Sequence, residues 1–263
     1  MEPVASSLPG GGYDNVIGPR ARFGVIIPST NTVVEHDFHA IGGAALPGVS
    51  FHYGRMYIAN PSLGSDAEFE ELLGQIRKSI NVAVRDVVTA KPSSMLMGMS
   101  AETFWGGVAG NATFEARVSD RAGGLAVSTG AASCRAALEA FGVQRIAVFS
   151  PYQPVADVQV GEYFTEAGFS VSAITGLRGP SATAIAEVGP ARIAEIIEQI
   201  DGPDVEAIVQ VGTNLSFVDQ AARLEAELGK PVIAINMATL WHALRHNGID
   251  DRVAGFGRLL AEY

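Results

Sequence analysis

The sequence predicts an α/β fold with two pseudo-symmetric lobes, each a mainly parallel sheet flanked by helices, and with a site at the lobe interface. An internal repeat relates Arg22 to Asn31 with Arg145 to Pro154, each a short apolar run that ends in Pro and polar residues. Such a run is typical of a buried strand that enters a loop. Strand patterns also alternate with helical patterns, which indicates parallel βαβ units. The length of 263 residues suits two small lobes.

Strands are expected wherever a short apolar run is bounded by Gly, Pro or polar turn residues. The first run is rich in β-branched residues and stops at Pro28, and the second alternates in character. In chain order, the expected strands are residues 21–28, 50–58, 94–98, 125–128, 145–150, 170–174, 207–211 and 232–235.

Helices are expected between these strands from their capping residues and apolar stripes. Ser65 or Asp66 begins the first long helix, while Gly142, Gly168 and Gly229 stand where later helices stop, because Gly favours the backbone of a helix C-cap. The first long helix has a one-sided apolar stripe formed by Phe69, Leu72, Leu73, Ile76 and Ile80. In chain order, the expected helices are residues 66–89, 130–141, 152–167, 190–200, 217–228 and 238–247.

The repeat and the element order divide the chain into three parts. Residues 1–20, rich in Gly, Pro and Ser, are expected to form a flexible N-terminal arm. Residues 21–124 plus 231–263 would form the first α/β lobe, and residues 125–230 the second. Ligands of such sheets bind at the carboxyl ends of the strands, which here carry Pro28, Gly98, Pro151 and Gly212.

Composition restricts the class of protein. A formal net charge of −10 argues against a nucleic-acid or anionic-membrane surface. A single Cys and 48% hydrophobic residues favour a cytoplasmic protein without disulfides. No apolar run approaches the ~18 residues of a membrane helix, and no phosphate or dinucleotide motif is present. The expected partner is therefore a small molecule.

Four segments carry a family resemblance. Val25-Ile-Ile-Pro28-Ser-Thr-Asn31, Phe149-Ser-Pro151-Tyr152, Gly212-Thr-Asn214-Leu and Asn236 to Arg245 resemble the aspartate/glutamate racemase superfamily, in its maleate isomerase and arylmalonate decarboxylase branch. The resemblance implies a cofactor-free, two-lobe enzyme, usually a homo-oligomer, that binds a carboxylate between its lobes. Members of the superfamily typically use one Cys from each half.

The resemblance places those cysteines at Gly98 and Gly212, so this chain has neither thiol. The two glycines are expected to leave a volume that could hold water or a bulkier substrate. Cys134 is expected to be a buried structural residue and His242 to pack the last helix. His36 and His39 are closely spaced, but they lack a distant third ligand, so no metal is expected.

The carboxylate-binding residues implied by the resemblance are better preserved. Asn31 would contact the substrate, with a turn-forming role as its alternative. Tyr152 would bind the carboxylate, with packing between the lobes as its alternative. The complete set of expected substrate-binding residues is Ser29, Asn31, Gly98, Met99, Tyr152, Gly212, Thr213 and Asn214.

Two residues are candidates for the chemistry. Ser100 resembles a position that donates to a developing oxyanion. Glu102 lies beside Phe104 and Trp105, and a carboxylate near aromatic rings is a candidate general base. Its alternative is a Glu at a helix start that faces backbone amides.

The leading hypothesis is a cofactor-independent enzyme that acts on a small carboxylate or carbonyl compound through an enediolate or oxyanion, as a single-base isomerase or decarboxylase. One alternative is a hydrolase of a cyclic amide, imide or lactone that uses Ser100, Glu102 and water. Another alternative is a non-catalytic carboxylate-binding protein.

Overall fold

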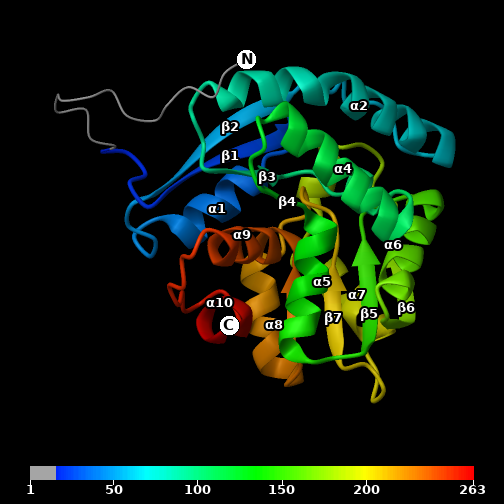
Figure 1. Ribbon diagram of the computed structural model, residues 1–263. Coiled ribbons are helices and arrows are strands. Elements are labelled where there is room, and N and C mark those ends of the chain that lie inside the picture. Colours follow the sequence, from blue (N-terminus) through cyan, green and yellow to red (C-terminus); the bar gives the residue numbers. More distant parts are fainter. Residues whose placement is uncertain (1–15) are drawn as a thin grey trace, which may run out of the picture.

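Two four-stranded parallel sheets form the two halves of the molecule (Figure 1). The computed structural model describes residues 16–263, and it confirms the predicted α/β class. The strand order is β2-β1-β3-β4 in the first sheet and β6-β5-β7-β8 in the second. All pairings within the two sheets are parallel. Parallel neighbours need crossover connections, which accounts for the alternation of strands and helices in the sequence.

The first sheet is covered on its outer side by α2, which runs along the top of the molecule in Figure 1. The α2 helix begins where expected, because Ser65 is its N-cap and accepts a hydrogen bond from the Glu68 amide. The elements of this part are β1 (Ala21–Pro28), α1 (Val34–Gly42), β2 (Val49–Met56), α2 (Asp66–Val88), β3 (Ser94–Met97), α3 (Ala101–Phe104), α4 (Gly107–Arg121) and β4 (Val127–Ser128).

The second sheet is centred on β5, which pairs with β6 on one side and β7 on the other. Thr129 caps the helix that leads into this half by accepting from the Ala132 amide. The elements are α5 (Gly130–Phe141), β5 (Arg145–Ser150), α6 (Pro154–Glu166), β6 (Ser170–Gly176), the 3-10 helix η1 (Ala184–Glu187), α7 (Pro190–Ile200), β7 (Ala207–Gln210), α8 (Val218–Leu228), β8 (Val232–Ala234), α9 (Ile235–His246) and α10 (Arg258–Glu262).

The sheets divide the chain differently from the expected lobes at two short strands. β4 falls within the expected second lobe, 125–230, but it pairs with β3 of the first sheet. β8 falls within the segment 231–263 of the expected first lobe, but it pairs with β7 of the second sheet. Each short strand covers an edge whose N–H and C=O groups would otherwise lack partners. The apolar pattern of a strand does not say which edge it will cover.

The helix α4 was not among the expected elements. Gly110 and Asn111 lie inside it, and both residue types have low helix propensity. Phe114 and Val118 are buried on its inner face, so tertiary packing stabilises a helix that the local sequence does not favour.

The described end of the expected N-terminal arm is attached to the first lobe. The Arg20 amide donates to the Gly48 carbonyl at 2.9 Å, and the Arg20 guanidinium pairs with Asp251. The rest of that arm, residues 1–15, lies outside the described residues. None of the helices between residues 16 and 263 has the length and apolar character needed to span a membrane.

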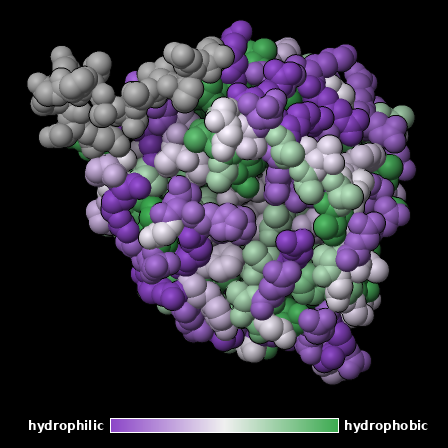
Figure 2. Space-filling model, in the orientation of Figure 1, coloured by the Kyte–Doolittle hydropathy of each residue, from purple (hydrophilic) through white to green (hydrophobic). Residues whose placement is uncertain are grey.

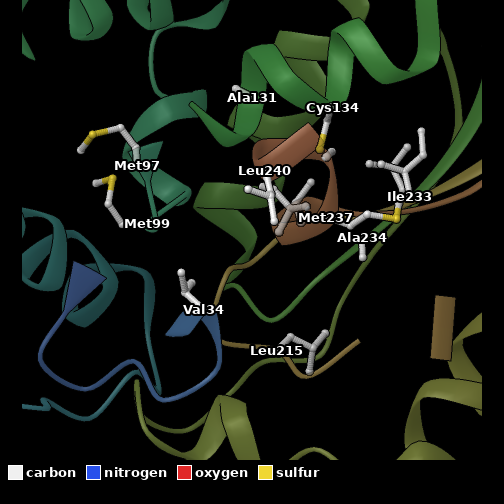
Figure 3. Close-up of a cluster of buried hydrophobic side chains, with 14 of the residues drawn as sticks. Val34, Met97, Met99, Ala131, Cys134, Leu215, Ile233, Ala234, Met237 and Leu240 are labelled. Atoms are coloured by element: carbon white, nitrogen blue, oxygen red, sulfur yellow. The ribbon is translucent and has the colours of Figure 1, made fainter. Parts of the chain in front are cut away.

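The apolar side chains are concentrated inside. Figure 3 shows one buried cluster, in which Cys134 lies among Ala131, Met237 and Leu240. The outer face in Figure 2 is largely hydrophilic over α2, as expected for a helix whose apolar stripe faces the sheet. The cluster in Figure 3 joins residues of both halves, because α9 packs against α1 and β3 as well as against α5.

Candidate functional site

A cavity lies where loops after β1, β3, β5 and β7 meet between the two sheets. Carboxyl ends of parallel strands point toward the same side, so the loop that follows each strand reaches this place. The hollow has a volume of about 510 Å³, including its solvent-open part. It is lined by Pro28, Thr30, Asn31, Phe69, Leu72, Ile76, Met99, Ser100, Ala101, Pro151, Tyr152, Ala182, Ile185, Gly212, Thr213 and Asn214.

Three residues from both halves form a cluster of donors in this cavity. Ser100 Oγ lies 2.5 Å from Tyr152 Oη, and it accepts a hydrogen bond from the Thr213 amide at 3.2 Å. Thr213 Oγ1 donates to the Gly98 carbonyl at 3.1 Å. Ser100, Tyr152 and Thr213 follow three different strands, and the structure brings them together as the resemblance implies.

Tyr152 is held firmly as a protonated phenol. Its amide donates to Ser150 Oγ at 3.0 Å, and Arg178 donates to its carbonyl at 2.6 Å. Its ring packs edge-on against Phe69, with the centroids 5.4 Å apart. Burial raises the pKa of Tyr152 above its usual range, although its hydrogen bond with Ser100 opposes the shift. The hydroxyl is therefore available as a hydrogen-bond or proton donor at neutral pH.

Asn31 combines the two roles considered for it. Its Oδ1 accepts from the amides of Val33 and Val34, both at 3.0 Å, which is the turn-forming role. Its Nδ2 donates to Thr213 Oγ1 at 3.3 Å. Because Nδ2 carries two hydrogens, a second donor is left that can serve a ligand in the cavity.

Asn214 braces the loops around the cavity. Its Oδ1 accepts from the Thr32 amide at 3.0 Å, and its Nδ2 donates to the carbonyls of Ala182 at 2.8 Å and Thr30 at 3.4 Å. These contacts join loops from both halves. They use both N–H groups of the side chain, so the amide of Asn214 serves the structure of the site more than it serves a ligand.

Apolar side chains form much of the wall. Phe69, Leu72 and Ile76 come from the inner face of α2, and Ile185 comes from η1. The sequence contained the α2 stripe, but a stripe that lines a cavity has the same period as one that covers a sheet. No signal in a single sequence separates the two, so this wall was missed.

The structure places Glu102 in an ion pair. Glu102 does not line the cavity, and Arg77 Nε donates to both of its carboxylate oxygens, at 2.8 and 3.0 Å. Arg117 Nη2 lies 3.9 Å from Glu102 Oε1, and the Arg77 guanidinium also lies over the Trp105 ring. Arg77 was not singled out from the sequence because it lies far from Glu102 in the chain. A base role for Glu102 is a prediction that this geometry does not favour.

The space expected at the two glycines is filled. A Cβ placed on Gly98 would lie 2.5 Å from Ile27 Cγ2 and 3.0 Å from Val34 Cγ1. A Cβ on Gly212 would lie 2.3 Å from Pro151 Cδ, and its φ of +115° is one that side-chain-bearing residues rarely adopt. The expectation of an open volume next to these glycines is therefore wrong, because neighbouring side chains occupy it.

Met99 and Ser29, two of the expected substrate-binding residues, lie in different places relative to the cavity. Met99 lines the cavity, whereas Ser29 does not. Ser29 is exposed, and its Oγ accepts from the Ile58 amide at 3.0 Å. Ser29 thus joins β1 to the chain after β2 and is separate from the described site.

The surroundings of Cys134 and His242 fit the structural roles expected for them. Cys134 is fully buried, and burial raises the pKa of its thiol far above the usual range, so it is not a thiolate at neutral pH. His242 Nδ1 lies 3.0 Å from Ser128 Oγ. Across the described residues, no group of three or more His, Cys, Asp or Glu side chains is arranged to hold a metal ion.

Known proteins resemble this chain over nearly its whole length. A maleate isomerase of Pseudomonas putida is 27% identical over 249 residues, which cover 91% of this chain and 97% of that protein. The arylmalonate decarboxylase of Bordetella bronchiseptica is 27% identical over 170 residues, 64% of this chain and 70% of that protein. These relatives are an isomerase and a decarboxylase, so the expectation of an enzyme is supported at the family level.

The solved structures agree. A maleate cis-trans isomerase variant of Nocardia farcinica, which carries a covalently bound succinylcysteine intermediate, has a TM-score of 0.83 and 25% identity, and the match covers 92% of this chain and 98% of that one. The family model described as arylmalonate decarboxylase matches residues 50–260. Because this match covers well over half of the sequence, the chain belongs to the arylmalonate decarboxylase family.

Proposed function

We propose that the protein is a cofactor-independent decarboxylase of small dicarboxylates that carry an apolar substituent. The observation that carries the proposal is the Ser100–Tyr152 hydroxyl pair, 2.5 Å apart, at an apolar cavity. Among the described residues that line this cavity, none has a carboxylate, imidazole, thiol or cationic side chain. Reactions that need a strong base or a thiol nucleophile are thus disfavoured.

Decarboxylation fits such a site because its first step needs no base. The bond between the α-carbon and one carboxylate breaks, CO₂ leaves, and the electron pair remains on the substrate as an enediolate. The second carboxylate, which is attached to the same α-carbon, becomes this enediolate, and donors aimed at it lower the barrier. The Tyr152 hydroxyl, the Asn31 amide and the Ser100 hydroxyl are the neutral donors that the cavity provides.

The apolar wall contributes in two ways. Phe69, Leu72 and Ile76 would contact an aryl or branched alkyl substituent and stabilise the complex by about 25 cal/mol per Å² of apolar surface buried. They also remove water from the carboxylate that leaves, and loss of its hydration favours conversion to neutral CO₂.

The reaction is completed by one proton. The α-carbon of the enediolate takes a proton from the Tyr152 or Ser100 hydroxyl, and water then returns a proton to the short hydrogen-bonded pair. For a malonate with two different α-substituents, protonation from one side of a fixed enediolate would give a single enantiomer. The wild-type enzyme in D₂O should place one deuteron on the product.

Turnover of phenylmalonate and of maleate tests the proposal. We expect CO₂ release from phenylmalonate and no fumarate from maleate. Fumarate formed without CO₂ would refute the decarboxylase assignment in favour of an isomerase. Thermal protection by phenylmalonate with no product would instead support the non-catalytic binding alternative.

Matched tyrosine variants test the hydroxyl pair. Tyr152→Phe should lower kcat by about 10²–10³-fold, the typical effect of losing one oxyanion donor. Tyr163→Phe is the control, because Tyr163 is also buried and its hydroxyl has no hydrogen-bond partner among the described residues. If both variants kept wild-type turnover, Tyr152 would have no part in the chemistry.

A further inference from the structure

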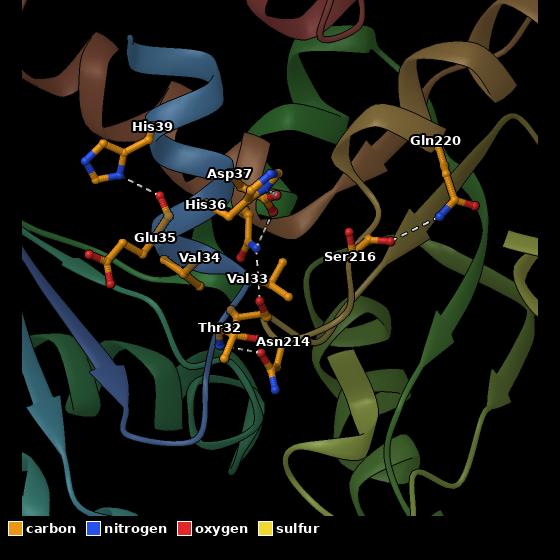
Figure 4. A network of polar contacts seen from close by, with 12 residues as sticks. Thr32, Val33, Val34, Glu35, His36, Asp37, His39, Asn214, Ser216 and Gln220 are labelled. Atoms are coloured by element: carbon orange, nitrogen blue, oxygen red, sulfur yellow. Dashed lines mark hydrogen bonds and ion pairs between the residues drawn. The ribbon is translucent and has the colours of Figure 1, made fainter. Parts of the chain in front are cut away.

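A buried carboxylate outside the cavity is connected to the cluster of donors. Asp37 on α1 is 3% exposed, and its Oδ2 accepts from Asn236 Nδ2 at 2.8 Å. The same Nδ2 donates to the Thr213 carbonyl at 3.0 Å. Figure 4 shows Asp37 on α1, above the loops that carry Thr32 and Asn214. A continuous chain of hydrogen bonds thus runs from α1 through α9 to the site.

The orientation of the Asn236 amide decides whether this chain exists. Both N–H groups of Nδ2 are used, one on Asp37 and one on Thr213. If the carboxamide were turned over, its oxygen would face two acceptors, the Asp37 carboxylate and the Thr213 carbonyl. A carboxylate has no hydrogen to donate when ionised, so ionised Asp37 permits only the observed orientation.

The chain of hydrogen bonds from Asp37 through Asn236 holds the Thr213 backbone in a fixed position. The carbonyl of Thr213 is held by Asn236, the amide donates to Ser100 Oγ, and the hydroxyl donates to the Gly98 carbonyl. Gly212, which precedes it, has a φ of +115°; glycine permits this conformation but does not fix it, so the hydrogen bonds of Thr213 hold the peptide in place. The support determines where the Thr213 amide points.

We propose that Asp37 is a positioning residue for the reaction: through Asn236 it fixes the Thr213 backbone and hence the Ser100 hydroxyl that the amide contacts. This inference rests on the proposed function for its effect on turnover. The contacts themselves do not depend on which carboxylate the enzyme accepts.

The surroundings of Asp37 make its charge sensitive to pH. Burial raises the pKa of Asp37 to about 6, while hydrogen bonds from Asn236 and His36 oppose the rise. The charged and titratable groups that face it are His36 of α1, whose Nδ1 lies 3.4 Å from Oδ1, and Asp219 of α8. An ionised acceptor holds an amide roughly twice as strongly as a neutral one. The support of Thr213 should therefore weaken as the pH falls through about 6.

Steady-state kinetics with phenylmalonate at several pH values test the role. In wild type, kcat/KM should fall as the pH drops through about 6. Asp37→Asn keeps an acceptor without the charge, so it should lose about tenfold in kcat/KM at pH 8 and lack the acid limb. Asn236→Ala removes the connection and should lose on the order of 10²-fold, and adding Asp37→Asn to it should cause little further loss.

Glu225→Gln is the matched control. Glu225 is also buried, burial raises its pKa, and it accepts from the Arg258 amide. We expect its kcat/KM and pH profile to stay within about twofold of wild type, because a change remote from the reacting groups leaves their geometry intact. An Asp37→Asn enzyme with the wild-type pH profile would overturn the proposal.

A measurement without turnover separates this inference from the proposed function. The side-chain NH₂ signals of Asn236, assigned in ¹⁵N spectra by their loss in Asn236→Ala, should shift with a midpoint near pH 6. In Asp37→Asn they should not shift over that range. Asn236 side-chain signals at the same positions in wild type and in Asp37→Asn at every pH would refute the positioning role. If phenylmalonate proved not to be a substrate, the NMR result would still decide the role of Asp37.

Discussion

Replacing Gly212 by Ala gives the sharpest test of the site's backbone. The new Cβ would lie 2.3 Å from Pro151 Cδ and 2.5 Å from Pro151 Cγ. A proline ring cannot swing aside as a long flexible side chain can. The backbone at Gly212 also has a φ of +115°, which no L side chain adopts without strain. Both effects oppose any side chain at this position, including a thiol.

The two effects set the size of the loss. An unfavourable backbone conformation costs about 1–3 kcal/mol, and an overpacked contact costs about 1–3 kcal/mol more. We therefore expect Gly212→Ala to lower the free energy of unfolding by about 2–6 kcal/mol. For a chain of this size, each kcal/mol lowers Tm by about 2–4 °C.

Thermal unfolding followed by circular dichroism measures the effect, and Gly142→Ala isolates the backbone contribution. Gly142 has a φ of +67°, but a Cβ there would meet no atom within 4 Å. We expect it to lose only about 1–2 kcal/mol. If Gly212→Ala were no less stable than Gly142→Ala, the clash with Pro151 would be refuted. If Gly212→Cys folded as stably as wild type, the account of both effects would fail.

Three further predictions concern buried groups. Arg77→Leu should destabilise the fold by about 1–3 kcal/mol, because it leaves the Glu102 carboxylate buried with Arg117 as its cationic neighbour, at 3.9 Å. Urea unfolding measures this loss, and the double variant Arg77→Leu/Glu102→Leu should recover most of it. No recovery in the double variant would contradict the reasoning. Burial lowers the pKa of His242 to about 4, below its usual value near 6.5, so its contribution to stability is complete above pH 6.5 and is lost as the pH falls toward 4. The loss amounts to about 3 kcal/mol. As the pH is lowered, the Tm of His242→Asn should therefore fall less steeply than the Tm of wild type. Equal slopes of Tm against pH in the two proteins would exclude His242 as the cause. Cys134→Ala should lower the free energy of unfolding by about 1–2 kcal/mol, because it leaves a small cavity, and it should keep the wild-type kcat. A large loss of kcat at unchanged stability would assign the thiol a role in the reaction.

Much of the fold could be predicted because its signals are local. The β-branched run before Pro28, the N-cap at Ser65 and the stop at Gly142 each act within a few residues. Their order implies parallel sheets, and parallel sheets bring the loops after several strands to one edge. Ser100, Tyr152 and Thr213 could thus be expected to meet, and they do.

Other features depend on partners far away in the chain. The same carboxylate motif predicts either a base or an ion pair until the position of Arg77 is known. The stripe of α2 predicts an apolar face but not that Phe69 and Ile76 line a cavity. The short strands β4 and β8 predict extended backbone but not the sheet edge that each one covers.

The sequence by itself determined the α/β class, the order of the strands, the absence of any thiol other than Cys134, and the loops that carry the site. Only the tertiary structure decided that Ile27 and Pro151 fill the space beside Gly98 and Gly212, and that α1 and α9 support the Thr213 loop. The physical reason is the distance along the chain over which each interaction acts. Backbone preference and apolar periodicity act between near neighbours in the chain. Packing and buried hydrogen bonds join residues that only the completed fold brings within a few ångströms.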